Sequence, residues 1–130
     1  MMLRIALYVF IGGGIGALVR ELLMLGVRVG YDGFPLDIFV ANVVGSLVLG
    51  ITAGMHSRMR VGDIGNALIG TGFCGGLTTF SSFVYASVVL MAASALEAAV
   101  AIIYVFASMI IGYAAVRIGQ RIGAAGARAA

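Results

Sequence analysis

The stretch TGFCGGLTTFSSF, residues 71–83, interrupts the longest apolar segment of the sequence, which covers about residues 63–93. A helix needs about 20 apolar residues to cross a bilayer, and this segment has about 30, too many for one simple crossing. Its paired glycines, followed by β-branched and hydroxyl-bearing residues, weaken a helix locally. We therefore predict two half-helices, joined by a short unwound stretch near residues 75–79.

Unwound backbone inside a bilayer exposes carbonyl and amide groups that lipid cannot satisfy. The break must therefore face protein, water or an ion. This requirement makes the third apolar segment the candidate functional element of the chain.

Three further apolar segments have the length of a single crossing, at about residues 3–25, 36–55 and 95–118. The turn-forming residues 30–35 separate the first two. The tail, residues 119–130, is rich in Gly, Ala and Arg, and we expect it to be flexible. The sequence thus predicts one all-α membrane domain over residues 1–130, with four transmembrane helices and the third broken in the middle.

The composition supports a membrane protein. Hydrophobic residues make up 62% of the 130 residues and charged residues 10%, whereas soluble domains are about 25% charged. Lipid must therefore cover much of the surface. One cysteine and one histidine, Cys74 and His56, exclude an internal disulfide and argue against a zinc site. No basic stripe interleaved with aromatics is present, so nucleic acid is excluded as a partner.

The arginines, which are all of the basic residues, predict an orientation. Four crossings place both termini on one side of the membrane. Six arginines fall on that side and two on the other, which favours cytoplasmic termini in a cell inner or plasma membrane. The larger group is Arg4, Arg58, Arg60, Arg117, Arg121 and Arg128, and the smaller is Arg20 and Arg28.

The glycines are better explained by helix packing than by a nucleotide. Residues 12–17 match the dinucleotide pattern G-x-G-x-x-A, but strands and amphipathic helices do not alternate around them. Small residues four apart allow close helix approach instead. Asp63 and Glu97 suit helix starts, and no Ser/His/Asp arrangement exists, so we expect no enzyme. The glycine pairs are Gly12/Gly16, Gly50/Gly54 and Gly72/Gly76.

Two features of the apolar segments suggest an anion path. Phe80 and Phe83 share one helical face, and the positive edges of their rings can contact an anion. On spacing alone, two ordinary core phenylalanines are the stronger interpretation. Asn42, the single amide of the second segment, can donate to a dehydrated small anion. An interhelical hydrogen bond is an equal alternative for this side chain.

Hydroxyl groups extend this path. Tyr104 and Ser108 lie four residues apart on one face of the fourth segment. Together with Thr79 and Ser82 they can form a polar track through an apolar bundle. Arg20, near the end of the first segment, is a candidate for a vestibule that gathers anions.

The sequence resembles the Fluc (CrcB) family of fluoride channels. The resemblance rests on GGLTTFSSF at 75–83 preceded by Thr71-Gly72-Phe73, on Asn42 followed by Gly45, and on Ala17-Leu18-Val19-Arg20. It spans essentially the whole chain, and the motif of the third segment is the most specific part.

The resemblance implies an antiparallel, dual-topology dimer with two pores that pass fluoride passively and reject chloride. It implies a structural sodium ion at the dimer centre, with Gly75 and Thr78 as the matching carbonyl donors. The matching pore residues are Asn42, Phe80 and Phe83, with Tyr104 and Ser108 on the fourth helix. Such a channel would export cytoplasmic fluoride and lower its toxicity. The family favours a homodimer, whereas the arginine bias leaves a paralogous heterodimer open.

Two alternatives belong to other classes. A proton-coupled small multidrug exporter is also short and four-helical, and Glu21 could serve as its membrane carboxylate. Against this, Glu21 lies late in the first segment, and the chain has no Trp to line a drug pocket. A passive structural subunit is the other alternative, in which Phe80 and Phe83 act only through packing.

Overall fold

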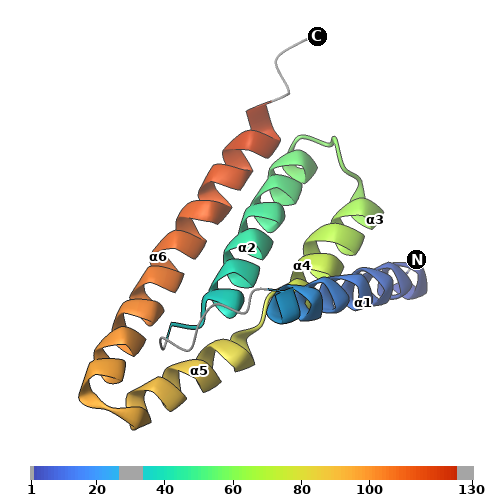
Figure 1. The fold of residues 1–130 in the computed structure, drawn as a ribbon. Helices are drawn as coiled ribbons and strands as arrows, with labels where there is room; N and C mark the ends of the chain where they lie inside the picture. Colours follow the sequence, from blue (N-terminus) through green and yellow to red (C-terminus); the bar gives the residue numbers. More distant parts are fainter. Residues whose placement is uncertain (1, 27–33, 126–130) are drawn as a thin grey trace.

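The computed structural model describes residues 2–26 and 34–125, and this part of the chain is almost entirely helical (Figure 1). Four stretches are long and apolar enough to cross a membrane. They confirm the predicted all-α class with four candidate membrane-spanning helices. The stretches are Met2–Gly26, Leu36–Ser57, Asp63–Ala93 and Ala95–Ala125.

The third stretch consists of several elements. It begins with α3 (Asp63–Gly65), continues as the π-helix η1 (Asn66–Phe73) and α4 (Cys74–Leu77), and ends as α5 (Phe80–Ala93). Thr78 and Thr79, between α4 and α5, have extended backbones. In Figure 1, α5 turns away from the direction of α4 and runs toward the start of the last helix. No sequence pattern predicted the π-helix.

The glycine pair of this stretch is helical, contrary to the expectation that it would help to unwind the chain. Gly75 and Gly76 both lie within α4. A Cβ added to Gly76 would collide with the Gly13 carbonyl of α1 (Met2–Gly26). The glycine is therefore needed for close helix packing. The extended residues come after it, where Thr78 and Thr79 stand.

Helix α1 crosses η1 and α4 at close range through its glycines. Gly12 and Gly16 are buried, and an added Cβ on either would collide with main-chain atoms of Leu68 or Phe73. The predicted packing role of this glycine pair is thus confirmed. The nucleotide pattern of residues 12–17 lies in the middle of this helix, which agrees with its rejection as a nucleotide site.

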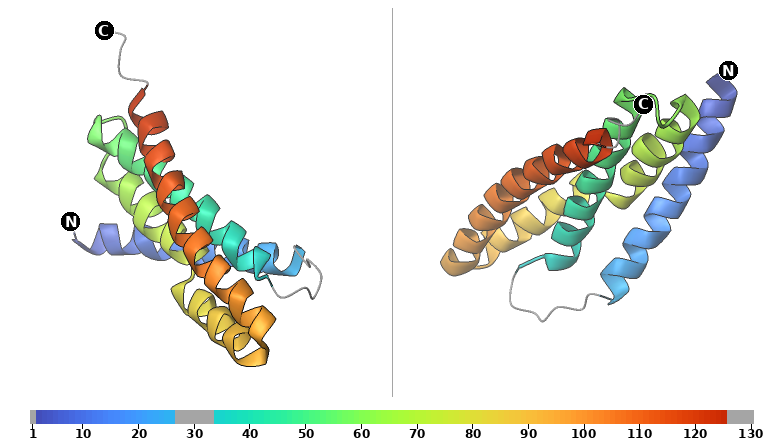
Figure 2. Two further views of the ribbon diagram at one scale, coloured as in Figure 1. Left: turned by 90° about the vertical axis from the view of Figure 1, so that its left-hand side faces the viewer. Right: turned by 90° about the horizontal axis from the view of Figure 1, so that it is seen from above.

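Helices α2 (Leu36–Ser57) and α6 (Ala95–Ala125) lie side by side along most of their length (Figures 1 and 2). Gly50 and Gly54 meet main-chain atoms of α6, and Gly119 and Gly123 meet those of α2. The predicted helix end at residue 118 was therefore wrong, since tight packing on α2 keeps the chain helical to Ala125. Residues 126–130 of the predicted flexible tail lie outside the described residues.

One end of the bundle gathers basic groups. Arg60, between α2 and α3, donates Nη1 to the Gly123 carbonyl near the end of α6 at 3.3 Å. Arg4, near the start of α1, borders a hollow together with Asp63. The start of α1 and the end of α6 thus share one end with the α2–α3 connection, as the even number of crossings requires. Arg28 and Arg128 lie outside the described residues.

The buried core is small, and large apolar side chains are exposed on α1, α5 and α6. In water such a surface would cause aggregation, whereas in a bilayer the acyl chains can cover it. The fold therefore suits lipid as its solvent.

The packing of α1 on η1 and α4 can be tested with Gly16→Ala. The added Cβ would collide with the Phe73 carbonyl, and overpacking of this kind costs about 1–3 kcal/mol. We expect a lower thermal unfolding midpoint for the purified protein in detergent. Gly14→Ala is the matched control, because nothing lies within 4 Å of its added Cβ. Equal midpoints for the two variants would contradict the packing role.

Candidate functional site

Asn42 joins α2 to the extended residues between α4 and α5. Its Nδ2 donates to the Thr79 carbonyl at 3.2 Å, and its Oδ1 accepts from the Thr79 N–H at 2.7 Å. One side chain thus satisfies both main-chain polar groups of a residue that leaves the helix. The predicted interhelical hydrogen bond of Asn42 is present. The second N–H of the amide is still available to another acceptor.

Thr79 also begins α5. Its Oγ1 accepts from the Ser82 N–H at 3.3 Å and donates to Ser82 Oγ at 3.0 Å, while Ser81 Oγ lies 3.3 Å away. A threonine in this capping position stabilises a helix start by about 1 kcal/mol. Two of the hydroxyls predicted for the polar track, those of Thr79 and Ser82, therefore bond to each other.

Thr78 bonds to the preceding helix α4 and packs against the side-chain-free surface of α2 at Gly45. Its N–H and Oγ1 both donate to the Cys74 carbonyl, at 2.9 and 2.8 Å. Its methyl group lies against Gly45, where an added Cβ would collide with it. Gly45, three residues after Asn42, thus provides the space that lets α2 approach the extended residues.

The carbonyls of Gly75 and Thr78 lose their regular helical donors at this point. In a continuous α-helix, Gly75 O would accept from the Thr79 N–H, which here donates to Asn42. Thr78 O would accept from the Ser82 N–H, which here donates to Thr79 Oγ1. Free carbonyl oxygens are ligands for hard cations. Among the described residues, no group of three acidic, His or Cys side chains offers an alternative metal site.

A hollow of about 440 Å³ lies beside these residues and is bordered by α2, η1, α4, α5 and α6. It brings together residues that are far apart in the sequence and were predicted separately. Its lining is Asn42, Ser46, Leu49, Gly70, Cys74, Gly75, Thr78, Thr79, Phe80, Phe83, Ser108 and Met109.

Phe80 and Phe83 line this hollow and belong to a row of aromatic rings. The ring centroids of Phe80 and Phe83 are 6.0 Å apart, and those of Phe83 and Tyr104 are 5.2 Å apart. Phe34 meets Tyr104 edge-on at 5.3 Å. Phe80 is 78% exposed, whereas Tyr104 is fully buried. The row therefore extends from the interior of the chain to its surface, and Phe80 is not the core residue that spacing alone favoured.

Two hydroxyls on α6 are buried without a hydrogen-bond partner in the described part of the chain, Tyr104 Oη and Ser108 Oγ. They are one helical turn apart, and Ser108 lines the hollow. An unsatisfied buried hydroxyl costs roughly 1–3 kcal/mol. Such groups are candidates for hydrogen bonds to a bound water or ion.

Comparison with known proteins gives the family of this chain. A family model described as CrcB-like protein, Camphor Resistance (CrcB), matches residues 7–120. The chain belongs to the CrcB family.

Several relatives of this CrcB protein carry a functional name. This chain is 43% identical over 120 residues to the fluoride-specific ion channel FluC 3 of Yersinia pseudotuberculosis, and the match covers 92% of this chain and 89% of that protein. It is 47% identical over 122 residues to FluC 2 of Brucella melitensis, covering 94% of this chain but 45% of that protein. Its family and its four long apolar helices make it a multi-pass membrane protein.

Two residues of α1 that the sequence suggested for ion or drug transport, Arg20 and Glu21, lie away from the hollow. Arg20 is half-buried and Glu21 is exposed, and neither lines the hollow. Both stand in the last turns of α1. This position near the helix end suits a carboxylate at the membrane interface, and family membership does not support the multidrug exporter.

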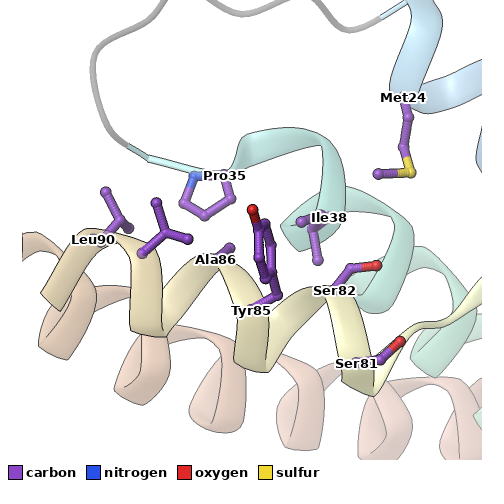
Figure 3. A pocket seen from close by; sticks show the side chains of 9 residues that line it. Met24, Pro35, Ile38, Ser81, Ser82, Tyr85, Ala86 and Leu90 are labelled. Atoms are coloured by element: carbon purple, nitrogen blue, oxygen red, sulfur yellow. The ribbon is translucent and has the colours of Figure 1, made fainter. Parts of the chain in front are cut away.

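Ser82 lines a different hollow of about 560 Å³, between the end of α1, the start of α2 and α5 (Figure 3). In Figure 3, the ring of Tyr85 rises from α5 toward Pro35 and Ile38. The structure thus separates Ser82 from Asn42 and Ser108, although the sequence placed them in one polar track. The reason is that Ser82 and Phe83 are adjacent on α5 and face different sides of the helix.

Sequence reasoning missed Ser46, Gly70 and Met109 as parts of the hollow. Ser46 carried a usable signal, because it lies four residues after Asn42 and so shares its helical face. Cys74 is buried and lines the hollow, and no pattern in the sequence predicted this position.

The role of Asn42 in holding the extended residues can be tested with Asn42→Leu, which keeps the branching of the side chain and removes both hydrogen bonds. Each lost bond is worth about 1 kcal/mol, and the unpaired Thr79 groups add to the loss. We expect faster amide hydrogen exchange across residues 78–83, measured by mass spectrometry, with exchange across α6 unchanged. Unaltered exchange at residues 78–83 would contradict this role.

Proposed function

We propose that this chain is a subunit of a fluoride-selective channel that passes the ion passively. The observation that carries the proposal is the convergence of Asn42, Ser108 and the rings of Phe80 and Phe83 on one hollow. The names of the relatives support the choice of ion.

The lining suits a small, strongly hydrated anion. Fluoride that leaves water needs hydrogen-bond donors in place of its hydration shell. In the lining, the Ser108 hydroxyl has no partner in the described residues and Asn42 retains one N–H, and the Tyr104 hydroxyl, also without a partner, lies one turn from Ser108 behind the lining. These groups are neutral, so they can bind the ion without trapping it. Larger anions such as chloride fit a narrow set of fixed donors poorly.

The phenylalanines supply weak contacts along the path. A ring edge carries positive partial charge without the desolvation cost of a full charge. Because Phe83 lines the hollow and Phe80 is 78% exposed, the two rings can pass an ion from inside the subunit to its surface.

The exposure of Phe80 beside an open hollow supports an assembly in which a second subunit covers this face. We propose an antiparallel dimer, embedded in the lipid bilayer, whose third transmembrane segments are interrupted at Thr78 and Thr79. A homodimer is favoured, and a paralogous partner of opposite orientation is the alternative raised by the arginine bias.

We also propose that the carbonyls of Gly75 and Thr78 help to hold a structural sodium ion at the dimer centre. Both oxygens have lost their regular helical donors, which fits a hard cation held by main-chain oxygen. When bound, the ion would offset the cost of unpaired carbonyls inside the membrane.

The proposed physiological role follows from acid–base chemistry. Hydrogen fluoride is a weak acid that crosses membranes in its neutral form and dissociates inside the cell. In the cell inner membrane, the negative interior would drive the trapped anion out through this channel. Export would then need no energy coupling.

The proposal is tested by fluoride efflux from liposomes that contain only this purified chain, measured with a fluoride electrode and a chloride control. We expect fluoride release without chloride release. Phe80→Ile and Phe83→Ile should each lower the flux about tenfold or more, because an aliphatic group lacks the positive ring edge. The matched control is Phe106→Ile, since Phe106 is an exposed ring outside the hollow.

Size-exclusion chromatography shows whether each variant remains folded. Glu21→Gln should leave fluoride efflux intact, whereas a proton-coupled exporter would lose activity. Absence of flux from folded wild-type protein, persisting after co-expression with a paralogous chain, would overturn the channel proposal.

The sodium proposal predicts cation-dependent stability. At equal ionic strength, Na⁺ should raise the thermal unfolding midpoint of the purified protein above its value in K⁺ or N-methylglucamine, because a ligand that binds the native state stabilises it. Equal midpoints in the three salts would contradict a structural sodium ion.

A further inference from the structure

Helix α6 has a gap in its row of polar side chains. Tyr104, Ser108 and Gly112 follow one another at steps of four residues and share one face. The first two carry buried hydroxyls without partners in the described residues, and the third carries no side chain. An ion that leaves Ser108 along this face therefore meets no donor from α6 at the next turn.

Ser46 of α2 stands at this gap. Its Oγ lies 3.8 Å from the place that a Cβ on Gly112 would occupy, and no other heavy atom outside its own helix backbone lies within 4 Å of that place. Ser46 also lines the hollow together with Ser108. The Ser46 hydroxyl of α2 thus lies beside Gly112, where α6 has no hydroxyl of its own.

The hydroxyl of Ser46 differs from those of three other residues in the membrane segments. Thr52 and Ser87 each donate to the carbonyl four residues earlier in their own helix, at 2.9 and 2.8 Å, and Thr78 donates to the Cys74 carbonyl of the preceding helix at 2.8 Å. This is the usual way for Ser and Thr to satisfy their hydroxyl inside a helix. Among the described residues, Ser46 makes no such bond, and neither does Ser108.

The hollow continues past Ser46. It borders Leu49, one turn further along α2, and Gly70 of η1. Ser46 therefore lies between the Phe80–Phe83 pair and the end of the bundle at which α2 meets α3. This is the position of an intermediate binding point along a path.

We propose that Ser46 is an anion-coordinating residue of the pore, which receives fluoride from Ser108 and supplies the donor missing at Gly112. The inference rests on the proposed channel function. A serine hydroxyl offers one hydrogen and rotates freely, so it can follow a moving ion across one helical turn.

The test compares fluoride efflux from liposomes for wild type, Ser46→Ala and Ser46→Cys. Loss of a hydrogen bond to a charged group should lower the flux about tenfold or more in Ser46→Ala. Cysteine keeps the approximate size but is a weak donor, so Ser46→Cys should also be slow. The matched control is Ser87→Ala, which removes a buried hydroxyl outside the hollow and should keep wild-type flux.

A second arm moves the hydroxyl from α2 to α6. The space beside Gly112 admits a small side chain, so the double variant Ser46→Ala/Gly112→Ser should recover most of the lost flux. Ser46→Ala/Gly112→Ala adds the carbon without the hydroxyl and should stay slow.

Wild-type flux in Ser46→Ala, or equal flux in the two double variants, would overturn the role of Ser46 while leaving the channel proposal intact. Absence of fluoride flux in the wild type would overturn both.

Discussion

A peptide group in the membrane interior must find its hydrogen-bond partner within the protein, and the rest of this structure depends on how the chain meets that constraint at Thr79. The Asn42 amide satisfies both polar groups of Thr79. Gly45 provides the space that brings α2 close enough for this contact. The Thr79 hydroxyl then begins α5 by accepting from the Ser82 N–H. Two extended residues thus become stable where lipid alone would favour a continuous helix.

The same arrangement produces the carbonyl oxygens and the ring positions on which the proposed ion binding depends. Donors diverted to Asn42 and Thr79 leave the carbonyls of Gly75 and Thr78 without their regular partners. The chain changes direction between α4 and α5 (Figure 1). Phe80 and Phe83, at the start of α5, line the same hollow as Asn42 and Ser46 of α2. The glycines of α1, α2 and α6 let helix backbones approach closely, so the helices around the hollow are tightly packed. Local irregularity is therefore supported by regular packing elsewhere.

The lining of the hollow combines several weak, neutral interactions rather than one strong charge. A single arginine in this place would bind an anion tightly and slow its release. Hydroxyls, one amide N–H and ring edges each contribute little, and their spacing along α2, α5 and α6 makes successive binding possible. This arrangement is consistent with passive conduction, in which an ion must leave each position as readily as it enters.

The sequence by itself determined the lipid environment and the four helices, whereas its resemblance to the Fluc (CrcB) family named Asn42, Phe80, Phe83 and Ser108 as one candidate site. The apolar composition indicates that lipid surrounds the chain, and helical periodicity indicates which residues share a face of a helix. Only the tertiary structure decided that Thr79 is the partner of Asn42, that Gly75 and Gly76 are helical, and that α6 continues to Ala125. It also separated Ser82 from the hollow and added Ser46 to it. These outcomes depend on contacts between residues far apart in the chain, and local patterns do not encode how closely two helices approach.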